Sequence, residues 1–161
     1  MGKVLTRDEL IAVRKLLRRD SKKVVFTNGC FDILHRGHIE YLHSAKAMGD
    51  VLVVGVNTDA SVRILKGPNR PVVAEEDRAL VLAALADVDF VTLFAEETPI
   101  ELIRAIVPDV LVKGADWKVD EVVGKEVVEA AGGVVKTISY IPNQSTTGIL
   151  AKIRKSEMTD R

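Results

Sequence analysis

The sequence has little cysteine, no net charge and no long apolar run. Its one cysteine among 161 residues, Cys30, cannot form a disulfide within the chain. Because 23 basic residues balance 23 acidic ones, the net charge would attract neither nucleic acid nor an anionic membrane. No apolar run is long enough to span a bilayer, and the first residues do not resemble a secretion signal. We therefore expect a cytoplasmic protein with no nucleic-acid partner and no membrane partner.

The chain also lacks several familiar catalytic patterns and any sign of a linker. It has no Gly-x-x-x-x-Gly-Lys-Ser/Thr loop and no Ser-His-Asp set, so neither a P-loop nor serine-based covalent catalysis is expected. It shows no repeat and no low-complexity segment. A chain of this length can bury a substantial core. We expect one domain over residues 1–161, with an N-terminal helix in 1–22, a catalytic core over 23–154 and a polar, frayed tail over 155–161.

Short apolar runs alternate along the chain with segments of helical periodicity. The runs predict five strands, over residues 23–28, 51–56, 88–94, 110–113 and 134–139. Capping patterns predict helices that begin near Thr6, Asn57–Asp59, Glu75, Thr98, Asp120 and Ser145. This alternation predicts an α/β fold with a doubly wound, Rossmann-like parallel sheet of five strands in the order 3-2-1-4-5. Such sheets bind ligands at the carboxyl ends of their strands.

The most informative stretch covers residues 27–38 and reads Thr-Asn-Gly-Cys-Phe-Asp-Ile-Leu-His-Arg-Gly-His. It joins the first strand to a segment with helical spacing, so His35 and His38 should lie at a helix start. The unpaired N–H groups and the dipole of that helix end suit a phosphate, and Gly37 would let the backbone approach it. The histidines could stabilise charge on phosphate oxygens, or they could be surface residues of an ordinary turn. We interpret Cys30 as a half-buried residue whose backbone matters, not as a catalyst.

Three further segments should reach the same edge of the sheet. The turn Gly114–Asp116 follows the fourth strand, and the hydroxyls of Ser145–Thr147 precede the apolar positions of the last helix. Those hydroxyls could cap the helix, bind phosphate or do both. The loop Lys66–Pro71 carries two cations and could fold over the site or simply be solvated. Trp117 could cover a nucleotide or belong to the core, and His43 is interpreted as an ordinary helix residue.

Gly29-x-Phe31-Asp32 followed by His35-x-Gly37-His38 resembles the first signature of the nucleotidyltransferase superfamily that includes the cytidylyltransferases. The resemblance extends from about Lys23 to Arg154. In detail the chain is similar to the D-glycero-D-manno-heptose 1-phosphate adenylyltransferases, which are standalone or form the C-terminal half of a bifunctional heptose kinase/adenylyltransferase; we expect the standalone form. The segments that carry this similarity are Lys66–Val72, Arg78–Leu85, Val88–Asp89, Thr98–Pro99, Pro108–Gly114, Asp116 and Ser145–Thr147.

The resemblance implies a reaction, a metal ion and an assembly. A sugar 1-phosphate would attack the α-phosphorus of ATP in line, and pyrophosphate would leave. Mg²⁺ would be bound mainly through the nucleotide phosphates. No protein ligand of the metal is implied, and the acids Glu75–Asp77 are explained by the dipole at a helix start. The product, ADP-heptose, would feed a lipopolysaccharide core or another surface glycan, and the family implies a homodimer.

The resemblance also assigns roles to residues of this chain. The implied catalytic residues are His35, His38 and Lys66. The implied nucleotide-binding residues are Cys30, Phe31, Gly37, His38, Lys113, Gly114, Asp116, Ser145, Thr146 and Thr147. The implied substrate-binding residues are Asp32, Asp59, Lys66, Arg70 and Arg78.

Two alternative functions stay open. The first is a cytidylyltransferase for glycerol 3-phosphate or another alcohol phosphate. The glycerol 3-phosphate enzymes carry Arg-Thr-Glu-Gly-Ile-Ser-Thr-Ser/Thr at the second signature, whereas residues 140–147 read Tyr-Ile-Pro-Asn-Gln-Ser-Thr-Thr. The missing arginine and glutamate favour adenine, although Gln144 replaces an aromatic expected in the heptose enzymes. The second alternative is a nucleotide-binding sensor without turnover, against which the intact His35, His38 and Lys66 argue.

Overall fold

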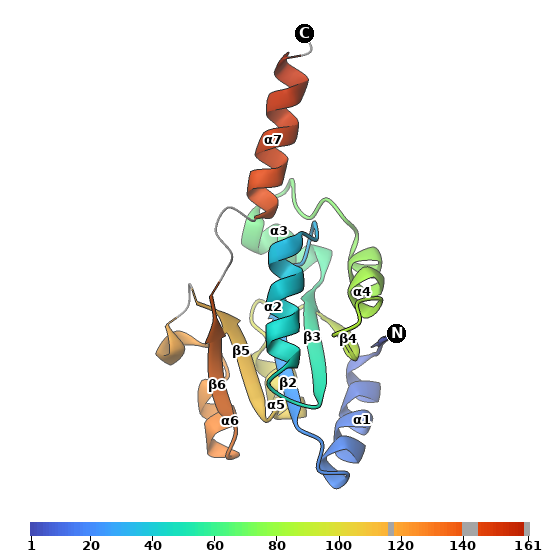
Figure 1. Cartoon of the computed structure of the whole chain (residues 1–161), viewed down its shortest axis with the longest axis vertical. Helices are drawn as coiled ribbons and strands as arrows, with labels where there is room; N and C mark the ends of the chain where they lie inside the picture. The colour runs from blue at the N-terminus through green and yellow to red at the C-terminus, as the bar shows by residue number, and fades with distance from the viewer. Residues whose placement is uncertain (116–117, 140–144, 160–161) are drawn as a thin grey trace.

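The computed structural model contains a six-stranded parallel sheet with helices on both faces (Figure 1). The structure describes residues 1–115, 118–139 and 145–159. The strands stand in the order β1-β4-β3-β2-β5-β6, and all neighbours are parallel. Their bounds are β1 Lys3–Val4, β2 Val24–Gly29, β3 Val51–Asn57, β4 Phe90–Phe94, β5 Val110–Gly114 and β6 Val134–Ile138. Every residue of β3 is buried, as the continuous apolar run of a central parallel strand predicts.

The prediction of five strands in the order 3-2-1-4-5 is wrong, because β1 adds an edge strand beside β4. Both residues of β1 are exposed, and the strand is held through its backbone: the amide of Lys3 donates to the carbonyl oxygen of Asp89 at 3.0 Å. Gly2 is needed for this close approach, since an added Cβ would lie 2.4 Å from the carbonyl oxygen of Val88. Two exposed residues carry no hydrophobic pattern, so the sequence offers no signal for β1. The five longer strands alone run β4-β3-β2-β5-β6.

Helical segments connect the strands. They are α1 Arg7–Arg19, α2 Arg36–Lys46, α3 Asp59–Lys66, α4 Glu75–Ala83, α5 Ile100–Ile106, the 3₁₀ turn η1 Val119–Glu121, α6 Lys125–Ala130 and α7 Thr146–Thr159. The predicted capping box at the start of α1 is confirmed: Glu9 N donates to the Thr6 side chain, and the Glu9 carboxylate accepts from Thr6 N.

Three predicted helix limits are wrong. The helix expected from Thr98 begins at Ile100, with Pro99 as its N-cap. The helix expected from Asp120 is divided, because Gly124 has a left-handed backbone (φ 90°) and caps α6 after the short turn η1. The tail expected to be frayed from residue 155 is helical as far as Thr159.

Two apolar clusters pack the helices against opposite faces of the sheet. On one face, α2 and α4 contribute buried side chains to the first cluster: Tyr41, Leu42, Ala45, Ala79, Leu82 and Ala83. On the other face, α1, α5 and the α6 segment contribute to the second: Leu10, Leu102, Ile103, Ile106, Val122 and Val128. Because the helices cover the faces, the carboxyl edge of the sheet is left to form a site.

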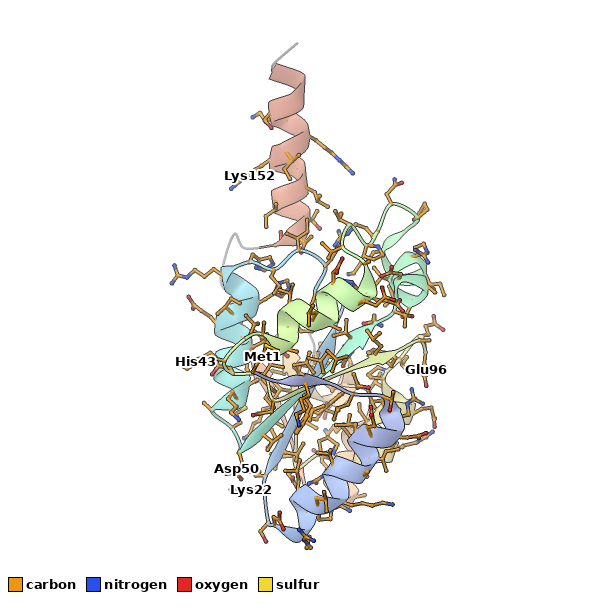
Figure 2. All side chains as sticks on the ribbon, turned by 90° about the vertical axis from the view of Figure 1, so that its right-hand side faces the viewer. Met1, Lys22, His43, Asp50, Glu96 and Lys152 are labelled. Atoms are coloured by element: carbon orange, nitrogen blue, oxygen red, sulfur yellow. The ribbon has the colours of Figure 1, made fainter. Side chains whose placement is uncertain are left out.

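Helix α7 projects away from the sheet (Figure 1). Residues 151–156 are exposed, and Lys152 points outward from the helix (Figure 2). Only the start of α7 therefore meets the rest of the described chain. Within the described ranges, none of the helices combines the length and the apolar character that crossing a bilayer demands.

Candidate active site

The signature turn begins where β2 ends at Gly29 and finishes where α2 begins at Arg36. His35 is the N-cap of α2, with an extended backbone (φ −145°, ψ 169°). His38 lies in the first helical turn, where its amide donates to the carbonyl oxygen of His35 at 2.9 Å. The predicted position of both histidines at a helix start is confirmed. Such an end offers N–H groups and a positive dipole to an anion.

The imidazoles of His35 and His38 are in contact. Their ring centroids lie 3.9 Å apart at an interplanar angle of 20°, and the Phe31 ring lies 5.2 Å from that of His38. Burial and the neighbouring His35 lower the pKa of His38 to about 4, and burial also lowers the pKa of His35. The Nδ1 atoms of both rings are buried and have no hydrogen-bond partner within the part of the chain described. Both rings are therefore neutral at pH 7, and an anionic ligand would favour their protonated forms.

A cavity of about 420 Å³ lies at the carboxyl ends of β2 and β5, beside the start of α2. Predicted site residues line most of it: Cys30, Phe31, Asp32, His38, Lys66, Arg70, Lys113, Gly114, Thr146 and Thr147. They come from four distant segments, so the fold brings together the signature turn, the Lys66 loop, the end of β5 and the start of α7. The other described candidates lie outside this lining: His35, Gly37, Asp59, Arg78 and Ser145.

Asp32 ties the signature turn to the loop after α3. Its side chain is 1% exposed, and one oxygen accepts from Nε of Arg70 at 2.5 Å. The other accepts from the backbone amides of Val72 and Val73 at 2.8 and 2.9 Å. This carboxylate is saturated by the protein, so it shapes the wall of the cavity. Lys66, at the exposed end of α3, opens the same loop.

Arg78 lies behind the cavity and is fully buried. Its guanidinium donates to the carbonyl oxygens of Val73 and Cys30 at 2.9 and 2.6 Å, and to Oδ1 of Asp59 at 2.7 Å. It thus joins α3, α4 and the signature turn. The contact to the Cys30 carbonyl agrees with our interpretation that the backbone of this residue matters. Burial raises the pKa of the Cys30 thiol, which keeps it protonated at neutral pH.

The start of α7 is held against the signature turn. Oγ of Ser145 accepts from the amide of Gly148 at 3.0 Å, so this hydroxyl caps the helix, which is one of the roles that the sequence analysis considered for it. Oγ1 of Thr146 donates to the carbonyl oxygen of Ile33 at 3.2 Å. A second helix N-terminus therefore borders the cavity, formed by residues more than a hundred positions from the first.

Four residues that the sequence analysis did not assign a role in the site also line the cavity: Asn28, Gly29, Tyr41 and Leu65. Asn28 is a polar residue near the carboxyl end of a buried strand, and that position was a usable signal. Tyr41 matches the apolar stripe of α2, and only the structure shows that its hydroxyl lies 2.7 Å from Oγ1 of Thr27.

Asp116, Trp117 and Gln144 lie outside the described residues. His43 is exposed on α2, with Nδ1 3.1 Å from Asp87, as expected of an ordinary helix residue (Figure 2).

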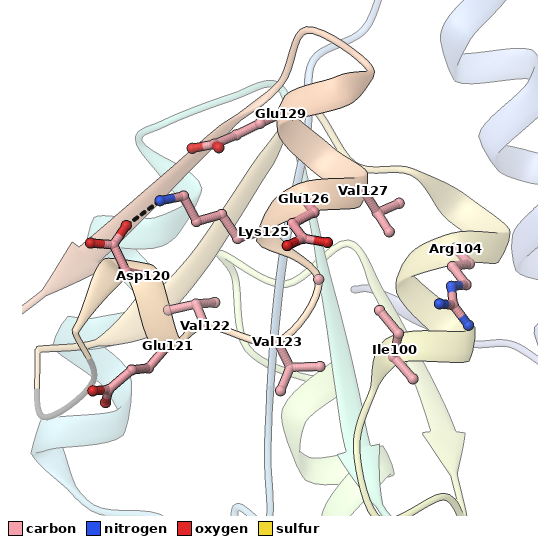
Figure 3. Close-up of a pocket in the computed structure, with 11 residues that line it drawn as sticks. Ile100, Arg104, Asp120, Glu121, Val122, Val123, Lys125, Glu126, Val127 and Glu129 are labelled. Carbon is pink, nitrogen blue, oxygen red and sulfur yellow. Dashed lines mark hydrogen bonds and ion pairs between the residues drawn. The ribbon is translucent and has the colours of Figure 1, made fainter.

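A larger cavity, of about 480 Å³, lies between α5 and the η1–α6 segment (Figure 3). Its charged lining includes Arg104, Glu121 and Glu126, and Lys125 is paired with Asp120. The described residues that line it include no histidine, and the lysine among them, Lys125 at the start of α6, is already paired with Asp120. The smaller cavity, which is lined by His38, Lys66 and Lys113, is therefore the better candidate for the active site.

The fold is that of a doubly wound α/β protein, and the cavity lies at the carboxyl edge of the sheet, where proteins of this class bind ligands. The profile of the cytidylyltransferase-like family matches residues 26–155. The chain belongs to the cytidylyltransferase-like family and is a nucleotidyltransferase. The resemblance seen in the signatures is thus confirmed.

Curated relatives match nearly the whole chain. The bifunctional protein HldE of Geotalea uraniireducens is 51% identical over 99% of this chain and 32% of its own length. The bifunctional protein HldE of Wolinella succinogenes is 54% identical over 96% of this chain and 32% of its own length. The chain thus spans about a third of the length of these relatives.

Solved structures share the fold. A lipopolysaccharide core biosynthesis protein from Thermoplasma volcanium is 32% identical with a TM-score of 0.62, over 74% of this chain and 97% of its own. A pantoate-beta-alanine ligase from Francisella tularensis has a TM-score of 0.57 over the whole of this chain and 80% of its own, at 14% identity. The second likeness concerns the fold alone.

Proposed function

We propose that this chain is an adenylyltransferase that joins ATP and a heptose 1-phosphate to give ADP-heptose and pyrophosphate. The observation that carries the reaction type is the cavity where His38, Lys66 and Lys113 meet beside the start of α7. The sugar is supported by the sequence similarity to heptose 1-phosphate adenylyltransferases and by the HldE relatives. The product would supply a lipopolysaccharide core or another surface glycan, and we expect the reaction in the cytoplasm.

The reaction needs positioning and charge stabilisation rather than a covalent catalyst. An oxygen of the sugar phosphate forms a bond to the α-phosphorus of ATP. The bond from that phosphorus to the bridging oxygen breaks, and pyrophosphate leaves with the electron pair. His35 and His38 would donate hydrogen bonds to the α- and β-phosphates as charge develops. Ser145, Thr146 and the backbone at the start of α7 would hold the β- and γ-phosphates.

The acceptor would lie on the side of the loop after α3. Lys66 would contact both the phosphates and the acceptor, because it is exposed at the rim of the cavity. Arg70 would bind the acceptor phosphate while Asp32 fixes its guanidinium. Asp59 and Arg78 would act on the acceptor through the loop that they hold in place.

Mg²⁺ would arrive with the nucleotide as part of the substrate. Over residues 1–115, 118–139 and 145–159, no group of three His, Cys, Asp or Glu side chains could hold a metal ion. The carboxylate of Asp32 already accepts three hydrogen bonds. The described side chains therefore form no metal cage, and the phosphates would be the main ligands.

Pyrophosphate release tests this proposal. The purified chain is supplied with Mg²⁺ and either ATP or CTP, each paired with heptose 1-phosphate or glycerol 3-phosphate. We expect release with ATP and heptose 1-phosphate. Release only with CTP and glycerol 3-phosphate would contradict the assignment and support the alcohol-phosphate cytidylyltransferase. ATP binding without release in any pairing would support the sensor.

A homodimer stays a prediction from the family resemblance. Exposed apolar side chains on α3 and α4 could contribute to such a contact: Ile64 is 72% exposed and Leu80 is 58% exposed. Light scattering coupled to size-exclusion chromatography would measure the mass in solution, and a monomer at micromolar concentration would contradict the prediction.

A further inference from the structure

Asn28 and Lys113 meet at the carboxyl edge of the sheet. Both are the next-to-last residues of their strands, β2 and β5, which pair in parallel. Nζ of Lys113 donates to Oδ1 of Asn28 at 2.5 Å, and both side chains line the candidate active-site cavity. Phe26 and Leu111, two residues earlier on each strand, are register partners in the second apolar cluster. The pair therefore continues that face of the sheet into the cavity.

The contact with Lys113 determines which way the Asn28 carboxamide points. An ammonium group has only hydrogen-bond donors, so the amide atom that faces it must be the oxygen. The amide nitrogen, Nδ2, is then directed away from Lys113. Nδ2 has no hydrogen-bond partner among the residues that the structure describes. Asn28 thus presents two N–H donors that the described part of the chain does not use.

Gly55 on β3 is the register partner of Asn28 and leaves room for it, because a Cβ at Gly55 would lie 3.3 Å from Cβ of Asn28 and 3.0 Å from the Phe26 ring. Because β3 lies on one side of the Asn28 carboxamide and Lys113 on the other, the carboxamide faces the cavity. The donors of Asn28 and the ammonium of Lys113 then form one positive edge of that cavity.

We propose that Asn28 binds the nucleotide directly, donating from Nδ2 to a phosphate oxygen, while its Oδ1 holds the ammonium of Lys113 in position. This inference rests on the proposed function, since it takes the cavity to be the nucleotide site. Lys113 adds the positive charge, and Asn28 adds a neutral donor beside it. An amide next to an ammonium suits an anionic oxygen better than it suits an apolar group or a cation.

Two variants, Asn28→Asp and Asn28→Ala, test whether Asn28 donates to phosphate or only positions the ammonium of Lys113. Aspartate keeps the acceptor for Lys113 and strengthens the pairing, but it has no donor and places a negative charge beside the phosphates. Alanine loses both bonds and adds no charge. If Asn28 donates to phosphate, the aspartate variant must be the weaker binder. An aspartate variant that binds ATP as well as the alanine variant would show that Asn28 mainly supports Lys113.

The measurement is calorimetric binding of ATP, tripolyphosphate and adenosine to the wild type and both variants. We expect ATP and tripolyphosphate affinity to fall about tenfold in Asn28→Ala and further in Asn28→Asp, with adenosine binding unchanged. In ¹⁵N NMR spectra of the wild type, the side-chain NH₂ pair that disappears in Asn28→Asp should shift when tripolyphosphate is added. Thermal unfolding of each variant is the control for folding.

Two results would overturn the proposal. One is an aspartate variant that binds ATP as well as the alanine variant or better, and the other is a side-chain NH₂ signal that tripolyphosphate does not move. Binding is measured without turnover, so the proposed function is judged separately. If ATP binds but no acceptor gives pyrophosphate, the proposed function fails, while the NH₂ signal and the two variants still test the role of Asn28.

Discussion

The imidazole rings of His35 and His38 are stacked, with centroids 3.9 Å apart. One ring belongs to the N-cap of α2 and the other to its first turn. Two protonated rings at this distance would repel each other, and burial also disfavours their charged forms. The pair is therefore neutral without a ligand. Phosphate oxygens that gain charge during the reaction would supply the missing negative partner.

Replacement of His38 by alanine should lower turnover by about two to three orders of magnitude. The ring is expected to act mainly in the transition state, so kcat should fall more than the apparent affinity for ATP. Steady-state pyrophosphate release measures both. His43→Ala on the same helix is the matched control, because His43 is exposed and does not line the cavity. Near-normal turnover in His38→Ala would show that the role assigned to this histidine is wrong.

The stability of the free protein should fall as the pH drops from about 6.5 towards 4. The pKa of His38 is lowered to about 4 in the folded state, so between these values the unfolded chain binds the proton and the folded chain does not. Urea unfolding at several pH values measures the effect. In His38→Gln the decline over this window should be shallower, because the titrating group is gone. An equal decline in both proteins would mean that His38 is not responsible.

Arg78→Met should destabilise the fold by about 3–5 kcal/mol. The change leaves the carbonyl oxygens of Val73 and Cys30 and the carboxylate of Asp59 without their buried donor. Hydrogen exchange should also increase in the signature turn and in the loop after α3. Arg63→Met, at an exposed position of α3, is the control and should change stability by less than about 0.5 kcal/mol. Equal stability of the two variants would contradict the assigned role of Arg78.

The Cys30 thiol should react slowly with iodoacetamide at pH 7.5. Burial raises its pKa, so little thiolate is present, and the residue is only partly exposed. Because Cys30 lines the cavity, ATP should slow the reaction further. Mass spectrometry follows the labelling, with urea-unfolded protein as the reference. Labelling as fast as in the unfolded chain, or no protection by ATP at any concentration, would argue against this placement.

Features that depend on neighbouring residues could be predicted from the sequence. The capping box at Thr6 and Glu9, the buried strand Val51–Asn57 and the helix start at His35 follow from local spacing. Boundaries were less predictable where one residue decided them, as when the left-handed Gly124 divided the helix expected from Asp120. The reaction and the substrates are still predictions, since they rest on resemblance and chemistry.

Contacts between distant side chains are set by the packing of the folded chain. The edge strand β1 is held by backbone hydrogen bonds to residues near position 90, and no pattern within Lys3–Val4 predicts it. Lys113 and Asn28 are 85 positions apart in the chain and share a hydrogen bond because β2 and β5 are neighbours in the sheet. The burial of Arg78 likewise depends on three segments that close around it. Contacts of this kind come from packing between distant segments, which local periodicity does not encode.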